Sequence, residues 1–123
     1  MYKNLTIISV LGVFAIVLGA FGAHALQKTL TIEGLKSFET AVTYQMFHVL
    51  VLLVVNLFPE FSKAQKNQIS WCFFAGIFFF SGSIYLIQLT PVTAKSIWFL
   101  TPLGGLLFIV GWCLMILHFL RKK

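Results

Sequence analysis

The chain has 123 residues, of which 59% are hydrophobic and only 10% are charged, whereas about 25% of the residues of a soluble domain carry charge. The formal net charge of +6 does not indicate nucleic-acid binding, because the basic residues are scattered over the chain ends and the gaps between apolar runs. Cys72 and Cys113 lie inside apolar runs without a metal-ligand spacing, so we expect both to be buried packing residues. No nucleophile, phosphate-loop or metal-protease motif occurs, and we expect neither an enzyme nor a bound metal or cofactor.

Four apolar runs follow one another along the chain, at about residues 5–26, 38–58, 69–89 and 97–120. A helix needs about 20 residues to cross roughly 30 Å of hydrocarbon. The second run is short, so we expect its helix to begin earlier, near Glu33, with Thr31 as its cap. Backbone groups in lipid must bond within the protein, and the alternating polarity of a barrel is absent. The sequence therefore predicts an all-α, integral membrane bundle of four transmembrane helices, forming one domain over residues 1–123.

The basic residues between these runs predict an orientation. Six of them lie on one side of the membrane: Lys3, Lys63, Lys66, Arg121, Lys122 and Lys123. Three lie on the other: Lys28, Lys36 and Lys95. The side richer in basic residues faces the cytoplasm, so we expect both termini there, in a bacterial plasma (inner) membrane. His118, which precedes the basic carboxyl-terminal residues, is expected to meet lipid headgroups.

Small residues in the first and fourth runs are typical of helix packing in lipid, because they let two backbones approach closely. The candidate packing positions are Gly12, Gly19, Gly22, Gly104, Gly105 and Gly111. Ala15 and Ala23 extend the first-run face. The alternative is that the first-run glycines line a pore or admit a lipid chain.

Two ionisable residues lie near the outer membrane boundary. His24 ends the first run, where it either hydrogen-bonds to a neighbouring helix or handles a proton or ligand. Glu39 either pairs with Lys36 as an interfacial carboxylate or forms a cation or proton site, with His24 across the helix pair.

The second run is the most polar of the four. At about 100° per residue, Tyr44, Gln45 and His48 share one face, and Glu39 and Thr43 lie on roughly the opposite face. Tyr44 and His48 have the i, i+4 spacing of a hydrogen-bonded pair. Polar groups on two sides predict that protein surrounds this helix, with one face inside the bundle and the other against a second subunit or a water-filled cleft.

The third run offers partners for the second. Ser81, Tyr85 and Gln88 share one face and are placed to hydrogen-bond with the second-run side chains, in a polar layer toward the outer half of the bundle. The candidate intramembrane polar site is His24, Glu39, Tyr44, Gln45, His48, Ser81 and Tyr85.

Four stretches together carry a family resemblance: residues 19–26 (GAFGAHAL), 40–48 (TAVTYQMFH), 80–86 (FSGSIYL), and 101–105 (TPLGG) with the later Gly111-Trp112. They resemble the small membrane proteins grouped as domain of unknown function 423, which are similar to the transmembrane protein 256 group. The resemblance covers nearly the whole chain. It implies a four-helix integral membrane protein, and it implies no activity.

These observations favour a non-enzymatic membrane protein that self-associates and holds a polar layer inside its bundle, as a structural or accessory component. Its expected partners are the lipid bilayer and further copies of itself, with no nucleic acid. The main alternative is a channel or transporter for protons, ions or a small solute, which predicts a hydrated cavity between the first two helices. An enzyme acting on a lipid or quinone-like substrate is a further alternative, and no acid–base pair supports it.

Overall fold

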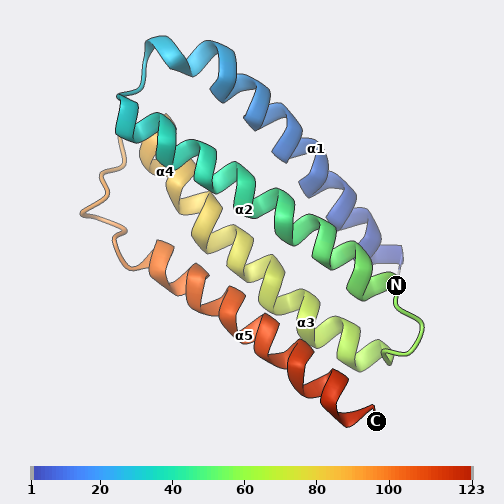
Figure 1. Cartoon of the computed structure of the whole chain (residues 1–123). Helices are drawn as coiled ribbons and strands as arrows, with labels where there is room; N and C mark the ends of the chain where they lie inside the picture. The colour runs from blue at the N-terminus through green and yellow to red at the C-terminus, as the bar shows by residue number, and fades with distance from the viewer. Residues whose placement is uncertain (1, 123) are drawn as a thin grey trace.

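The computed structural model describes residues 2–122, and the regular elements in that range are helical (Figure 1). In chain order they are α1 (Tyr2–His24), the 3₁₀ turn η1 (Ala25–Lys28), α2 (Ile32–Leu57), α3 (Lys63–Gly76), the π-helical turn η2 (Ile77–Ser81), α4 (Gly82–Leu89) and α5 (Leu100–Arg121). The elements α3, η2 and α4 follow without a break and form one span, Lys63–Leu89. Four helical segments of the described chain are long and apolar enough to cross a membrane. The predicted all-α bundle of four transmembrane helices is therefore confirmed.

Three spans begin earlier than the apolar runs, with α1 at Tyr2 ahead of its run by about three residues and the next two by about six. α2 begins at Ile32, which confirms the expected start near Glu33, and its cap is Thr31, whose side chain accepts a hydrogen bond from the first-turn backbone. α3 begins at Lys63 rather than near residue 69, after a capping box formed by Ser62 and Gln65. The first turn of α2 is partly polar and that of α3 is polar, so both lie outside the apolar runs. Their caps satisfy backbone N–H groups that a helix start leaves unpaired.

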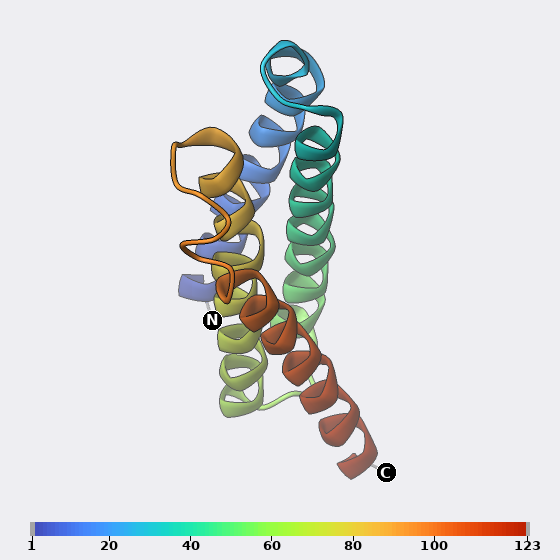
Figure 2. The same ribbon diagram turned by 90° about the vertical axis from the view of Figure 1, so that its left-hand side faces the viewer.

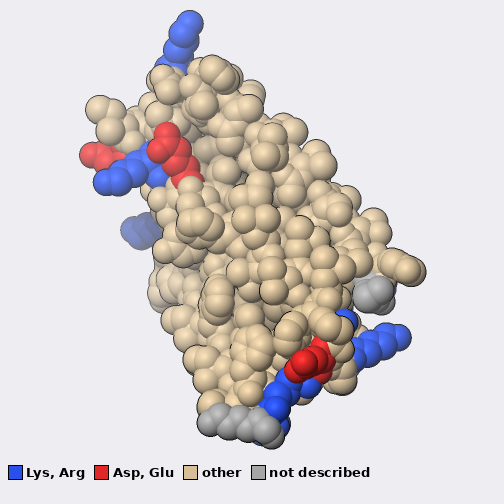
Figure 3. Space-filling model, turned by 45° about the vertical axis from the view of Figure 1, so that its right-hand side comes forward, with Lys and Arg blue, Asp and Glu red and all other residues tan. Residues whose placement is uncertain are grey.

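The spans are arranged around a central pair. α2 and the α3–α4 span lie side by side, α1 packs mainly on α2, and α5 packs on α3 and η2 (Figure 1). Figure 2 shows α5 inclined to the α3–α4 span. Both termini lie at the same end as the α2–α3 connection, here named the proximal end; the α1–α2 and α4–α5 connections lie at the distal end. Charged side chains gather toward these two ends, and the middle of the face seen in Figure 3 carries none.

Glycines bring α5 against the α3–α4 span. A side-chain carbon added at Gly104 would lie 2.2 Å from the backbone nitrogen of Phe80, and one added at Gly111 would lie 2.5 Å from the Phe73 ring. Phe80 belongs to the π-helical turn η2, so the wider turn lies where the two backbones come closest. Only a residue without a side chain fits at this crossing.

The small residues of α1 pack against α2 of the same chain. A carbon added at Gly22 would lie 2.9 Å from the Phe38 ring of α2, and one added at Gly12 would lie 3.6 Å from Val49. Ala15 is buried on the same face. The α1 seam therefore packs against α2, while Gly19 and Gly22 also line an open groove between the two helices.

The prediction that both cysteines are buried is wrong for Cys113, which is exposed, while Cys72 is half-buried. The buried positions of α5 are Gly104, Phe108, Gly111 and His118. This spacing of four, three and seven residues defines one helix face, and Cys113 falls outside it, on the face that meets the bilayer.

We predict that Gly104→Ala destabilises the bundle by roughly 1–3 kcal/mol, because the new methyl group meets the Phe80 backbone and one helix must shift. Gly105→Ala is the matched control, since the nearest atom to its added carbon is 3.9 Å away. Thermal unfolding of both variants in detergent measures the difference. Equal unfolding temperatures would contradict the close approach at Gly104.

Candidate functional site

Gln45 lies at the centre of the intramembrane polar layer and joins three helices. Its side chain is only 2% exposed. The Nε2 group donates to the Leu11 carbonyl of α1 at 2.8 Å, and Oε1 accepts a hydrogen bond from the Tyr85 hydroxyl of α4 at 2.7 Å. The amide thus uses its donor and acceptor ends toward two different neighbours, fixing the positions of α1 and α4 about α2.

Two serines of the third span complete this layer. The Ser81 hydroxyl, at the end of the π-helical turn, donates to the Ala41 carbonyl of α2 at 2.7 Å. Ser83 is hydrogen-bonded to the hydroxyl of Thr101 on α5. These bonds run from α4 and η2 in both directions, to α2 and to α5. The structure therefore brings Gln45, Ser81 and Tyr85 into one region, and Gln88 lies instead beside Gly34.

Both ring nitrogens of His48 have polar partners, and its ring packs against an aromatic side chain. Its Nδ1 lies 2.7 Å from the Tyr44 carbonyl oxygen, and its Nε2 accepts a hydrogen bond from the Trp112 Nε1–H at 3.2 Å. The ring also stacks on Phe108, with 3.8 Å between centroids and 6° between planes. A carbonyl only accepts and an indole N–H only donates, so His48 is the neutral tautomer that carries its proton on Nδ1.

The predicted Tyr44–His48 pair exists only in part. The hydrogen bond goes to the backbone carbonyl of Tyr44, not to its hydroxyl. The Tyr44 ring is 41% exposed and stacks on Phe80 at 5.0 Å. The residue lies beside the polar layer and supplies a carbonyl to it, whereas its side chain faces outward.

A second polar cluster at the proximal end was missed from the sequence. Asn56 is fully buried; it donates to the Ser70 hydroxyl of α3 at 2.8 Å and accepts a hydrogen bond from Asn4 of α1 at 3.1 Å. Asn4 also donates to Asn67 of α3 at 3.0 Å. The available signal was an asparagine inside an apolar run, because a lone amide in lipid needs a partner on a neighbouring helix.

The expectation that His118 meets lipid headgroups is wrong. The side chain is 6% exposed and lies between two glutamines of α3, with Gln65 Nε2 3.3 Å from Nδ1 and Gln68 Oε1 3.1 Å from Nε2. Gln65 and Gln68 are three residues apart and thus neighbours on one helix face. The two glutamines provide polar partners for the imidazole, so His118 faces α3 although it lies next to the basic end of α5.

His24 and Glu39 lie outside this interior. His24 is exposed where α1 ends. Glu39 is exposed on the wall of an open groove of about 260 Å³ between α1 and α2, which Gly19, Gly22 and Thr43 also line. The structure therefore does not bring Glu39 to Gln45 or His48, and His24 is not part of the groove wall.

The interior is saturated with hydrogen bonds. Within residues 2–122, no buried side-chain nitrogen or oxygen lacks a hydrogen-bond partner. Nor does this part of the chain hold a group of three or more His, Cys, Asp and Glu side chains able to bind a metal ion. These hydrogen bonds connect the helices and fix their relative positions, and Gln45 and Tyr85 also line a hollow of about 210 Å³ beside α1.

Residues 18–105 match the sequence profile of a family described as protein of unknown function, DUF423. The chain is similar to a UPF0382 membrane protein of Staphylococcus aureus, with 44% identity over 99 residues, which are 80% of each chain. The counterpart in Staphylococcus saprophyticus is 43% identical over 80% of this chain and 81% of its own, and one in Staphylococcus epidermidis is 43% identical over 84% and 83%. No solved structure matches the chain.

A double-mutant cycle on Gln45→Leu and Tyr85→Phe will measure the central hydrogen bond. We expect each single variant to lower the free energy of unfolding and the pair to show a coupling of about 0.6 kcal/mol, with about 1.7 as an upper bound for membrane helices. The control cycle pairs Gln45→Leu with Ser83→Ala, whose partner is Thr101. Purely additive effects in the first cycle would show that the two side chains do not interact.

We also predict the protonation state of His48 at neutral pH. Nitrogen-15 NMR of labelled protein should show Nδ1 protonated and Nε2 unprotonated, because their partners are a carbonyl and an indole N–H. A His48→Gln variant identifies the signals. Trp112→Phe should shift the Nε2 resonance alone, and an imidazolium in the wild-type protein would refute the assignment.

Proposed function

The chain belongs to the DUF423 family of membrane proteins, and from this premise we propose that it is a non-catalytic structural or accessory membrane protein that self-associates in the bilayer. The observation that carries the proposal is the saturated interior, in which the described buried polar side chains bond to one another or to backbone. Such an interior serves helix positioning rather than solute binding. Function is then left to the outer faces of the bundle.

The face that best suits a second copy is the groove between α1 and α2. It sets a carboxylate, Glu39, and a hydroxyl, Thr43, beside the small residues Gly19 and Gly22. Lys36 is exposed one turn earlier on the same side of α2 and carries the opposite charge. A two-fold contact is self-complementary, so Lys36 of each copy would pair with Glu39 of the other, and the groove would be covered.

We place this protein in the plasma membrane of a bacterium with its proximal end in the cytoplasm. Of the described basic residues, five lie at that end: Lys3, Lys63, Lys66, Arg121 and Lys122. Three lie at the distal end: Lys28, Lys36 and Lys95. The excess supports this orientation, and the relatives named above come from bacteria.

The alternative function is a channel or transporter for protons, ions or a small solute. The α1–α2 groove favours it, since that hypothesis expects a hydrated cavity between these helices. Against it, the groove holds about 260 Å³, opens sideways near the distal end and contains neither His24 nor Gln45. A conducting path through the interior would have to break the hydrogen bonds of Gln45 and His48.

Cysteine cross-linking in membranes tests self-association. In a Cys72→Ala, Cys113→Ala background, Thr43→Cys should give covalent dimers on oxidation or with a short bis-maleimide, because Thr43 lines the proposed contact. Ile109→Cys, which is 59% exposed on α5, is the matched control and should stay monomeric. The mass in a mild detergent should be at least twice 13.9 kDa. A monomer by mass with no cross-link at residue 43 would refute the proposal.

A charge reversal tests which residues form the contact. Glu39→Lys should weaken dimerisation through repulsion from Lys36 of the other copy, and adding Lys36→Glu should restore it. Dimer fraction against detergent dilution is the measurement. Dimerisation that survives Glu39→Lys unchanged would place the interface on another face.

A further inference from the structure

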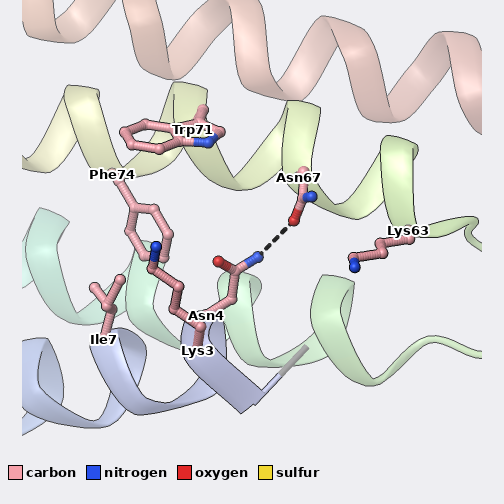
Figure 4. Close-up of a pocket in the computed structure, with 7 residues that line it drawn as sticks. All are labelled: Lys3, Asn4, Ile7, Lys63, Asn67, Trp71 and Phe74. Atoms are coloured by element: carbon pink, nitrogen blue, oxygen red, sulfur yellow. Dashed lines mark hydrogen bonds between the residues drawn. The ribbon is translucent and has the colours of Figure 1, made fainter.

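A pocket of about 440 Å³ lies at the proximal end, between the first turns of α1 and α3 (Figure 4). Figure 4 shows Asn4 and Asn67 meeting at its centre, with Lys3 and Phe74 on one side and Lys63 on the other. A smaller pocket of about 240 Å³ shares Asn4, Lys63 and Asn67 and adds Lys66 to the wall. The two hollows share three lining residues and together form one recess, which three lysines line.

The lining changes from basic to apolar along the helices. Lys63 is the first residue of α3 and Lys3 lies in the first turn of α1, which places both at the membrane boundary. Trp71 and Phe74 follow two and three turns further along α3, so the wall extends about 16 Å from the boundary into the hydrocarbon. Trp71 is 71% exposed and is free to lie against an acyl chain. This polarity gradient matches a lipid molecule, with its headgroup at the lysines and one chain along the aromatic rings.

The charged side chains that line the recess are all positive. Its basic residues are Lys3, Lys63 and Lys66, and no acidic residue is among its lining residues in the described chain. Glu60, in the α2–α3 connection, is exposed outside it. The Asn67 amide nitrogen is turned toward Lys63 in Figure 4, and its carbonyl already accepts from Asn4. An ammonium group and an amide N–H that face one space form a donor pair for a phosphate oxygen.

We propose that this recess binds an anionic glycerophospholipid of the surrounding bilayer. The phosphate lies among Lys3, Lys63 and Lys66 and accepts a hydrogen bond from Asn67, and an acyl chain lies on Trp71 and Phe74. Three positive charges without a carboxylate favour a net-negative headgroup over a zwitterionic one. The apolar wall favours a membrane lipid over a soluble phosphate, because a free anion gains nothing from two aromatic rings.

The test is native mass spectrometry of the purified full chain, titrated with phosphatidylglycerol or phosphatidylcholine in detergent. We expect tighter binding of phosphatidylglycerol, and a loss of about tenfold or more in that preference for Lys3→Gln/Lys63→Gln. Lys28→Gln/Lys95→Gln removes the same charge from the distal end and should keep the wild-type preference. Equal binding of the two lipids, or equal loss in both double variants, would overturn the proposal.

A second variant distinguishes a lost phosphate contact from a loss of the folded structure. Asn67→Asp keeps the oxygen that accepts from Asn4 but replaces the amide donor with a negative charge, so it should abolish the preference for phosphatidylglycerol. Excess inorganic phosphate should not displace the bound lipid. Displacement at equal affinity would assign the recess to a soluble anion, and an unchanged preference in Asn67→Asp would exclude the phosphate contact.

Discussion

Polar side chains on α2 find partners on each of the other spans, and the arrangement of the bundle follows from those bonds. Gln45 reaches α1 and α4, and the Ala41 carbonyl accepts from the π-helical turn. His48 accepts from Trp112 of α5, and Asn56 donates to Ser70 of α3. Lipid supplies no replacement for such partners, so each helix is fixed in depth and rotation by groups it cannot leave unpaired.

The proposed self-association and lipid binding both use the outer surfaces of this bundle. The described buried polar side chains all have hydrogen-bond partners, whereas the distal groove and the proximal recess present Glu39 and three lysines at the surface. The distal groove combines Glu39 with small residues, which suits a helix of another copy. The proximal recess combines lysines with Trp71 and Phe74, which suits a lipid. Self-association and lipid binding therefore need not compete for one face.

The sequence predicts the spans well, because an apolar run of helical length is a direct physical signal. It also predicts the hydrogen bond of Tyr85 to a second-run side chain, which proves to be Gln45, whereas Ser81 bonds to the Ala41 carbonyl instead. It fails where the answer depends on distant residues: His118 turns inward because of Gln65 and Gln68. The π-helical turn changes which residues face inward at Phe80, and no periodicity argument anticipates that extra residue.

Ion flux into liposomes that contain the purified chain tests the central claim, that the polar interior holds the helices and conducts nothing. The protein must unfold cooperatively in the same preparation, which shows that it is folded. We expect proton and cation flux no greater than in empty liposomes, for the wild type and for Glu39→Gln and His24→Ala alike. Flux that the folded wild-type protein supports and that either substitution abolishes would contradict the account and make the polar groups a pathway.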